Sequence, residues 1–397
     1  MKIKRTAQNE AYIEALWDDF LLAGTVNEIL LGEVADHLYL EDVPPRLQRP
    51  YDGDGKDPLE TYAAETGLLD SIEGAVEAMA DDPYGTRPYS ELLRRHDPET
   101  LIETLLARTG RHIRRYSPGA VTGNPYFQRI HPAVASSGAF RLGEADYLPF
   151  EFWQAYHFYD PSDPFGYGDA GFFDGPVRFP ALFEKKRVWM SIVMSEIASM
   201  EEGIRAARGR VVTYGLGLGY YAFMAAEKPE VDHVTVVEVD PHVIRLFQEQ
   251  ILPQFSHPEK IEILEADAFP FIEAERDGAY DYGYADFWAG TDDGFLLYLD
   301  FLPLTARFQK TRFGFWIESC FSDYYLRPMV MKWLMQEGLG RTVHLPRNEK
   351  KVHAAQEAFF HFLEQEEGRV TSPAGIDHLL TPEALSGLAL QFSLKRK

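Results

Sequence analysis

The fold is decided by the stretch Arg210-Val-Val-Thr-Tyr-Gly-Leu-Gly-Leu-Gly-Tyr-Tyr-Ala-Phe-Met-Ala-Ala226. An apolar run that ends at Tyr214 turns through Gly215, Gly217 and Gly219 and continues in a helical pattern of small and apolar residues. Glycine accepts positive φ and lets a ligand approach the backbone. A turn from strand into helix also leaves unpaired N–H groups pointing at one place. The stretch therefore predicts a strand, a glycine turn and a helix that together bind a polar part of a ligand.

Strands and helices alternate downstream of this turn. Strands are predicted at 210–214, 233–239, 260–266, 280–285 and 312–318, with helices at 220–227, 240–247, 269–275 and 325–337. Apolar strands of about six residues that alternate with helices predict an α/β fold with a doubly wound parallel sheet. Such a sheet binds ligands at the carboxyl ends of its strands. Two further strands are predicted at 341–346 and 388–394, and a helix at 188–197.

Acidic residues stand at the predicted strand ends. Glu238 lies 19 residues after the last glycine of the turn, where a carboxylate can accept both ribose hydroxyls. Asp240 competes for that role but is better explained as a helix cap. Asp267 can accept from an adenine amine, with the N–H of Ala268 serving the ring, or it can cap the next helix. Asp286 closes the fourth strand and faces the reacting end of a ligand laid along the strands.

These segments resemble the successive motifs of class I S-adenosylmethionine-dependent methyltransferases, and most closely those of the spermidine-synthase-like branch. The matching segments are Tyr214-Gly-Leu-Gly-Leu-Gly219, Val237-Glu-Val-Asp-Pro241, Glu265-Ala-Asp-Ala-Phe269 and 280–286. The resemblance covers about residues 188–320. It implies a Rossmann-like sheet of seven strands whose last strand is antiparallel, and S-adenosylmethionine as the cofactor.

The resemblance also implies roles for single residues. The glycines approach the methionine part, Glu238 holds the ribose, Asp267 and Ala268 hold the adenine, and Asp286 lies beside the sulfonium. The implied cofactor-binding set is Tyr214, Gly215, Gly217, Gly219, Glu238, Val239, Asp267, Ala268 and Asp286. Asp286 is also the candidate catalytic residue, as a base or as the group that positions an amine. Trp288 is the candidate wall of the acceptor site, where its ring can meet a cation.

The sequence departs from the resembling families in ways that bear on the substrate. Polyamine aminopropyltransferases carry an aspartate within the glycine turn, where this chain has Leu218, and an Asp-Ser-Ser-Asp type run where this chain has Asp286-Phe-Trp-Ala. Many methyltransferases, for their part, have an acid at the position of Tyr214. Because the acids of the aminopropyltransferases are missing, we expect methyl transfer to a small-molecule acceptor such as an amine. The alternatives are a polyamine aminopropyltransferase-like enzyme and a non-catalytic S-adenosylmethionine-binding regulatory protein. A dehydrogenase is disfavoured because Tyr220 replaces a fingerprint glycine.

The rest of the chain divides into parts of different character. Residues 1–125 predict an α-helical domain, 126–187 an aromatic, Pro- and Gly-rich connector or substrate wall, and 188–397 the methyltransferase-like domain. The sequence leaves open whether the N-terminal part recognises the acceptor, closes the site or forms a homodimer. The turn that begins Asp52-Gly-Asp54 lacks the ligands that an EF-hand calcium loop requires, so no metal is assigned.

Composition excludes several classes of partner. The chain of 397 residues has 62 acidic and 39 basic residues, a net charge of −23. This charge repels nucleic-acid phosphates and anionic membranes. No apolar run approaches the roughly 20 residues of a membrane helix. The single cysteine, Cys320, rules out an internal disulfide framework and fits a reducing cytoplasm.

Overall fold

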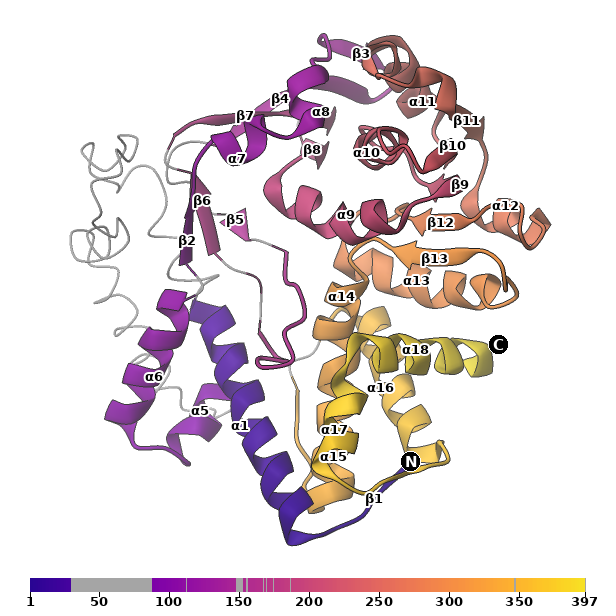
Figure 1. Cartoon of the computed structure of the whole chain (residues 1–397). Helices are drawn as coiled ribbons and strands as arrows, with labels where there is room; N and C mark the ends of the chain where they lie inside the picture. The colour runs from indigo at the N-terminus through magenta and orange to yellow at the C-terminus, as the bar shows by residue number, and fades with distance from the viewer. Residues whose placement is uncertain are drawn as a thin grey trace. The chain divides into compact units, whose positions relative to one another are not determined.

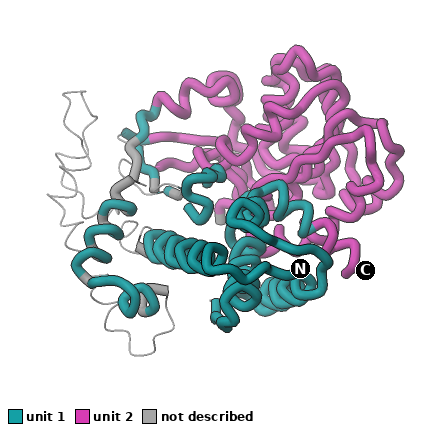
Figure 2. The backbone as a smooth tube through the Cα atoms, turned by 60° about the horizontal axis from the view of Figure 1, so that its bottom comes forward, with its two compact units in different colours: residues 1–118, 148–176, 319–389 teal, residues 119–147, 177–318, 390–397 magenta. Residues whose placement is uncertain are grey.

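The structure is a computed structural model that describes residues 1–29, 88–111, 113–147, 153–154, 156–166, 168, 170–173, 175–185, 187–345 and 348–396. The chain forms two compact units (Figure 2). Unit 1 contains residues 1–118, 148–176 and 319–389, and unit 2 contains 119–147, 177–318 and 390–397. Each unit therefore gathers segments that are distant in the sequence, and neither coincides with one of the three consecutive parts expected from the sequence.

Unit 2 contains the predicted parallel sheet. Its strands are β9 (Gly209–Tyr214), β10 (Val231–Glu238), β11 (Ile261–Glu265), β12 (Tyr282–Ala285) and β13 (Arg312–Phe315). They are all parallel and lie in the order β11-β10-β9-β12-β13 (Figure 1). The chain builds outward from β9 through β10 to β11 and then returns to the other side of β9. This reversal beside β9 is the place where doubly wound sheets bind ligands.

Helices cover both faces of this sheet. α9 (Met194–Ala206) precedes β9, and α10 (Tyr220–Ala226), α11 (Pro241–Gln250), α12 (Ala268–Ala274) and α13 (Thr291–Thr305) follow successive strands. Figure 1 shows α9 and α10 on one face and α12 and α13 on the other. The central strands are accordingly buried on both faces: Val211 and Val212 are fully buried, and all four residues of β12 are buried. The prediction of an α/β fold with a parallel sheet is confirmed.

The predicted sixth and seventh strands are wrong. Residues 341–345 are not in a strand, and 388–394 lie within helix α18 (Pro382–Arg396). The buried apolar residues of α18 are Leu385, Leu388, Ala389 and Phe392, a helical spacing of three and four. A short apolar run cannot be assigned to strand or helix from its composition alone. Among the described residues, the parallel sheet therefore has five strands and no antiparallel one.

A second sheet in unit 2 comes from the segment expected to be a connector. β3 (Ala135–Ser137), β4 (Phe140–Tyr147), β7 (Val177–Glu184) and β8 (Arg187–Ser191) form an antiparallel sheet in that order. The short helices α7 (Gly119–Thr122) and α8 (Pro125–Arg129) precede it. The helix predicted at 188–197 is half wrong, because 188–191 pair with β7 as strand β8 and α9 begins only at Met194.

Unit 1 is mainly helical in its described residues. Its helices are α1 (Ala7–Ile29), α5 (Pro88–Leu93), α6 (Pro98–Arg111), α14 (Glu318–Phe321, from its second residue), a π-helix (Ser322–Leu326), α15 (Arg327–Leu339), α16 (Lys350–Gln365), α17 (Pro373–Leu380) and the start of α18. β2 (Ile113–Tyr116), β6 (Ala170–Phe173) and β5 (Trp153–Gln154) form one small sheet, and β1 (Lys2–Ile3) pairs with β14 (Arg369–Val370). The helix predicted at 325–337 is confirmed, and the start of the chain, within the predicted α-helical part, forms helix α1. The Asp52-Gly-Asp54 turn lies outside the described residues.

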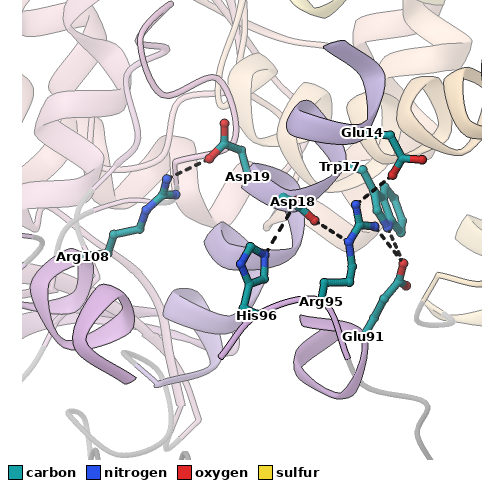
Figure 3. A network of polar contacts seen from close by, with 8 residues as sticks. All are labelled: Glu14, Trp17, Asp18, Asp19, Glu91, Arg95, His96 and Arg108. Atoms are coloured by element: carbon teal, nitrogen blue, oxygen red, sulfur yellow. Dashed lines mark hydrogen bonds and ion pairs between the residues drawn. The ribbon is translucent and has the colours of Figure 1, made fainter. Parts of the chain in front are cut away.

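Polar contacts join the first helices of unit 1 (Figure 3). The guanidinium of Arg95 lies 2.8 Å from Glu14, 2.9 Å from Asp18 and 3.4 Å from Glu91. The Trp17 indole N–H donates to the same Glu91 at 2.8 Å. A partly buried network of this kind orients α1 against α5, whereas isolated exposed pairs contribute little. None of the described helices is long and apolar enough to cross a membrane.

Candidate functional site

The glycine turn between β9 and α10 requires its three glycines. Gly215, Gly217 and Gly219 have φ of 102°, 52° and 72°, a region that other residues rarely adopt. A Cβ on Gly215 would lie 1.7 Å from the backbone oxygen of Asp286, and one on Gly217 would lie 2.2 Å from the sulfur of Met190. The turn is therefore enclosed by the end of β12 on one side and by β8 on the other.

Backbone hydrogen bonds tie the ends of three neighbouring strands to this turn. Gly215 N–H donates to Val237 at 2.8 Å, and Asp286 N–H donates to Tyr214 at 2.7 Å. Gly219 N–H donates back to Leu216 at 2.8 Å and closes the turn. Consequently the residues that follow β9, β10 and β12 lie around one place, as the sequence predicts for the carboxyl ends of parallel strands.

Glu238, the predicted ribose ligand, is buried and bonded to the turn. Its Oε2 accepts from Leu216 N–H at 3.1 Å, and its Oε1 accepts from the N–H groups of Val239 and Asp240 at 2.8 Å each. A carboxylate has about four acceptor positions, so one remains, on Oε2. Burial raises the pKa of this carboxyl, while the three backbone hydrogen bonds oppose the rise. Glu238 thus braces the turn and, without rearrangement, can accept one ribose hydroxyl rather than two.

The residues beyond Glu238 present an apolar surface beside exposed polar groups. Val239 exposes 65% of its surface, although it is β-branched and apolar. Asp240 caps α11 by accepting from His242 N–H at 2.8 Å, which confirms its predicted role. Asp267 is exposed and caps α12 by accepting from Phe269 N–H at 2.8 Å. Ala268 is the first residue of α12. Val239 therefore offers a surface on which a flat base can lie.

Two carboxyls beside the turn have pKa values that are raised to near neutral pH. Burial raises the pKa of Asp286 to about 7, and the negative charge of Glu238 adds to the rise. Burial likewise raises the pKa of Glu196, on the first turn of α9, to about 8, with the charge of Asp286 as the second cause. Among the described residues neither carboxyl makes a side-chain hydrogen bond or an ion pair. A cation placed here would meet two carboxylates that lack a partner.

Glu196 was missed by the sequence reasoning, which considered only strand ends and the segments after them. The one local signal is an acidic residue within the apolar run 188–200, whereas Glu201 and Glu202 on the same helix are exposed. The spacing to the glycine turn carries no rule that would place its side chain near Asp286. That proximity arises because α9 packs on α10, and no local pattern encodes it.

Two predicted site residues have side chains in the core. Tyr214 is 1% exposed and its ring contacts Phe301 edge-on with centroids 5.1 Å apart. Only its backbone carbonyl lies at the turn. Trp288, the predicted acceptor wall, is 5% exposed and lies against Phe287 with ring centroids 5.0 Å apart. Among the described residues, no group of three or more His, Cys, Asp or Glu side chains could hold a metal ion.

Comparison with known proteins finds only weak similarity. No family model matches the chain, and no curated protein matches it. The chain is similar to a solved spermidine synthase from Thermotoga maritima, with 15% identity and a TM-score of 0.21 over 27% of this chain and 43% of that one. It is also similar to a probable spermidine synthase from Corynebacterium glutamicum ATCC 13032, with 15% identity and a TM-score of 0.28 over 44% and 60%. The chain thus spans about half the length of these structures.

Proposed function

We propose that unit 2 binds an S-adenosyl sulfonium nucleoside at the carboxyl ends of β9, β10 and β12 and transfers an alkyl group from its sulfur to an amine. The observation that carries this proposal is the pair Asp286 and Glu196, two carboxyls beside the glycine turn with raised pKa values and no cation paired to them among the described residues. A sulfonium and an ammonium are both cations. In a partly buried site either one is stabilised by such carboxylates more strongly than in water.

The nucleoside end of the ligand is assigned to the neighbouring strand ends. The exposed Val239 offers the apolar surface for the base, and Glu238 keeps one acceptor position on the oxygen that accepts from Leu216 N–H. Asp267 keeps one carboxylate oxygen for an adenine amine while the other caps α12. With this assignment, the 5′ sulfur lies toward the glycine turn and Asp286.

The reaction is an in-line displacement at the carbon attached to sulfur. The amine lone pair forms the new C–N bond, and the C–S bond breaks with its electron pair passing to sulfur. The nucleoside therefore leaves as a neutral thioether. An amine is reactive only after it loses a proton. The Asp286 carboxyl, with a pKa of about 7, is partly ionised near neutral pH and can accept that proton, whereas Glu196, with a pKa of about 8, can accept one at slightly alkaline pH. The remaining contribution of the protein is alignment of the two reactants.

Charge favours an aminopropyl group as the group transferred. S-adenosylmethionine carries a carboxylate that would add a negative charge beside Asp286 and Glu196, whereas its decarboxylated form carries only cations. Glu196 supplies, from α9, the carboxylate that is missing from the glycine turn. Methyl transfer is the second candidate. Leu218, which is apolar and 1% exposed, stands in the turn where polyamine aminopropyltransferases carry an aspartate, so the turn itself lacks the carboxylate of those enzymes.

Product analysis separates these candidates. The full chain is incubated with S-adenosylmethionine or its decarboxylated form and a panel of amines, and the nucleoside products are identified by mass spectrometry. Methylthioadenosine from the decarboxylated donor alone supports aminopropyl transfer, and S-adenosylhomocysteine from S-adenosylmethionine supports methyl transfer. If calorimetry shows binding of methylthioadenosine or S-adenosylhomocysteine but no turnover is detected, the chain is a non-catalytic binding protein. If neither nucleoside binds, the proposed site is refuted.

A further inference from the structure

Two side chains at the start of α8 reach the glycine turn from outside the parallel sheet. The hydroxyl of Tyr126 donates to the backbone oxygen of Leu218 at 2.7 Å. The side-chain amide of Asn124 donates to the hydroxyl of Tyr220 at 2.8 Å. Asn124 and Tyr126, which we call the α8 clamp, therefore hold the residues on either side of Gly219. Neither belongs to the segment in which the sequence motifs lie.

The clamp is itself held in one conformation. Asn124 caps α8 by accepting from the N–H of Tyr126 at 2.9 Å. Tyr126 is fully buried, and its ring contacts the rings of Tyr220 and Phe223 edge-on, each with centroids 5.4 Å apart. Burial raises the pKa of the Tyr126 hydroxyl well above its ordinary value, so this hydroxyl stays a hydrogen-bond donor at neutral pH.

The clamp acts on a single peptide plane of the turn. The carbonyl of Leu218 and the N–H of Gly219 belong to one planar unit. Tyr126 holds the carbonyl end, and the hydrogen bond from Gly219 to Leu216 holds the N–H end. With both ends held, this plane cannot rotate. The two hydrogen bonds thereby restrain the turn that carries the N–H groups of Gly217 and Leu218.

We infer that Asn124 and Tyr126 are positioning residues of the donor site, and that they govern affinity for the sulfur end of the nucleoside but not for its adenosine end. This inference rests on the proposed function. The sulfur end is the part assigned to the glycine turn, which the clamp contacts directly. The adenosine end is assigned to Val239 and Asp267, and neither of these makes a hydrogen bond to the clamp.

The test is a comparison of two nucleosides on the full chain. Tyr126→Phe retains the buried ring and removes one hydrogen bond to the turn. Calorimetry should show about a fivefold weaker affinity for methylthioadenosine and an unchanged affinity for adenosine, as the loss of one net hydrogen bond implies. A purely structural role would instead lower the melting temperature and weaken both nucleosides alike.

Matched variants keep the test decisive. Tyr298 is also fully buried and its hydroxyl donates to Glu318 at 2.5 Å, so Tyr298→Phe should change neither affinity. If Tyr126→Phe does not fold, Tyr220→Phe removes the acceptor of the other clamp bond, and the same selective loss is expected. An unchanged affinity for methylthioadenosine, or equal weakening of both nucleosides, overturns the inference. If the wild-type chain binds neither nucleoside, the proposed function fails and the inference fails with it.

Discussion

Replacing Asp286 by asparagine should stabilise the protein at alkaline pH while abolishing the proposed alkyl transfer. Burial raises the pKa of this carboxyl from 3.8 to about 7, so the folded state binds a proton more tightly than the unfolded state does. Each pKa unit corresponds to about 1.4 kcal/mol, which gives about 4 kcal/mol once the carboxyl is ionised in both states. Asp286 is half-buried, and solvent screening reduces this figure to about 2 kcal/mol.

The sign of the pH dependence follows from the direction of the pKa. Because the pKa is higher in the folded state, this carboxyl destabilises the fold progressively as pH rises from about 4 to about 7. Asparagine is neutral throughout, so the advantage of Asp286→Asn should be small near pH 4 and reach about 2 kcal/mol at pH 8.5. Urea unfolding at the two pH values, followed by circular dichroism, measures it.

Asp267→Asn is the matched control. It removes the same charge from another strand end, but Asp267 is exposed, and asparagine caps a helix as well as aspartate does. Its effect on the free energy of unfolding should stay below about 0.5 kcal/mol. A variant at position 286 that is less stable than wild type at pH 8.5, or whose gain does not change with pH, would refute the assignment of a half-buried carboxyl with a raised pKa.

Three further changes test other parts of the structure. Glu196→Gln should lower kcat/KM for the amine about tenfold to a hundredfold, by loss of a charged hydrogen bond, and remove a titration near pH 8 from the rate profile, whereas the exposed Glu202→Gln should do neither. If the pH–rate profile of Glu196→Gln still titrates near pH 8, Glu196 does not have the proposed role. Gly215→Ala should cost about 3 kcal/mol and eliminate methylthioadenosine binding, because its Cβ would overlap a backbone oxygen at 1.7 Å; normal binding would show that the turn adapts. Arg327→Met should cost about 3–5 kcal/mol by leaving the buried Asp323 carboxylate unpaired, and Asp323→Asn in the same chain should recover most of it in urea unfolding. If the double variant loses the sum of the two single losses in unfolding free energy, Arg327 and Asp323 are not coupled.

Some features of the site could be predicted because they depend on residues close together in the sequence. Gly215, Gly217 and Gly219 mark the turn, since only glycine readily adopts their positive φ. Asp240 before a proline marks a helix cap. Regular alternation of apolar strands with helices is sufficient to predict parallel strands whose ends share an edge.

Predictions of other features were wrong or incomplete because these features depend on long-range packing. The apolar run 388–394 fits a strand or a helix equally well, and burial of one helical face decided between them. The strand-end position of Glu238 suggested a free carboxylate, but the backbone of the turn folds around it and occupies three acceptor positions.

By itself, then, the sequence determined the parallel α/β sheet and the edge at which we propose that a ligand binds, because the spacing of apolar residues, glycines and caps is local information. Only the tertiary structure decided which carboxyls share that edge. Glu196 and Asp286 are 90 positions apart, and Tyr126 lies 92 positions before the carbonyl it holds. Their chemistry arises from burial and proximity, which no local pattern records. The resulting acidic, clamped glycine turn is what favours a cationic sulfonium donor and an amine acceptor in the proposed function.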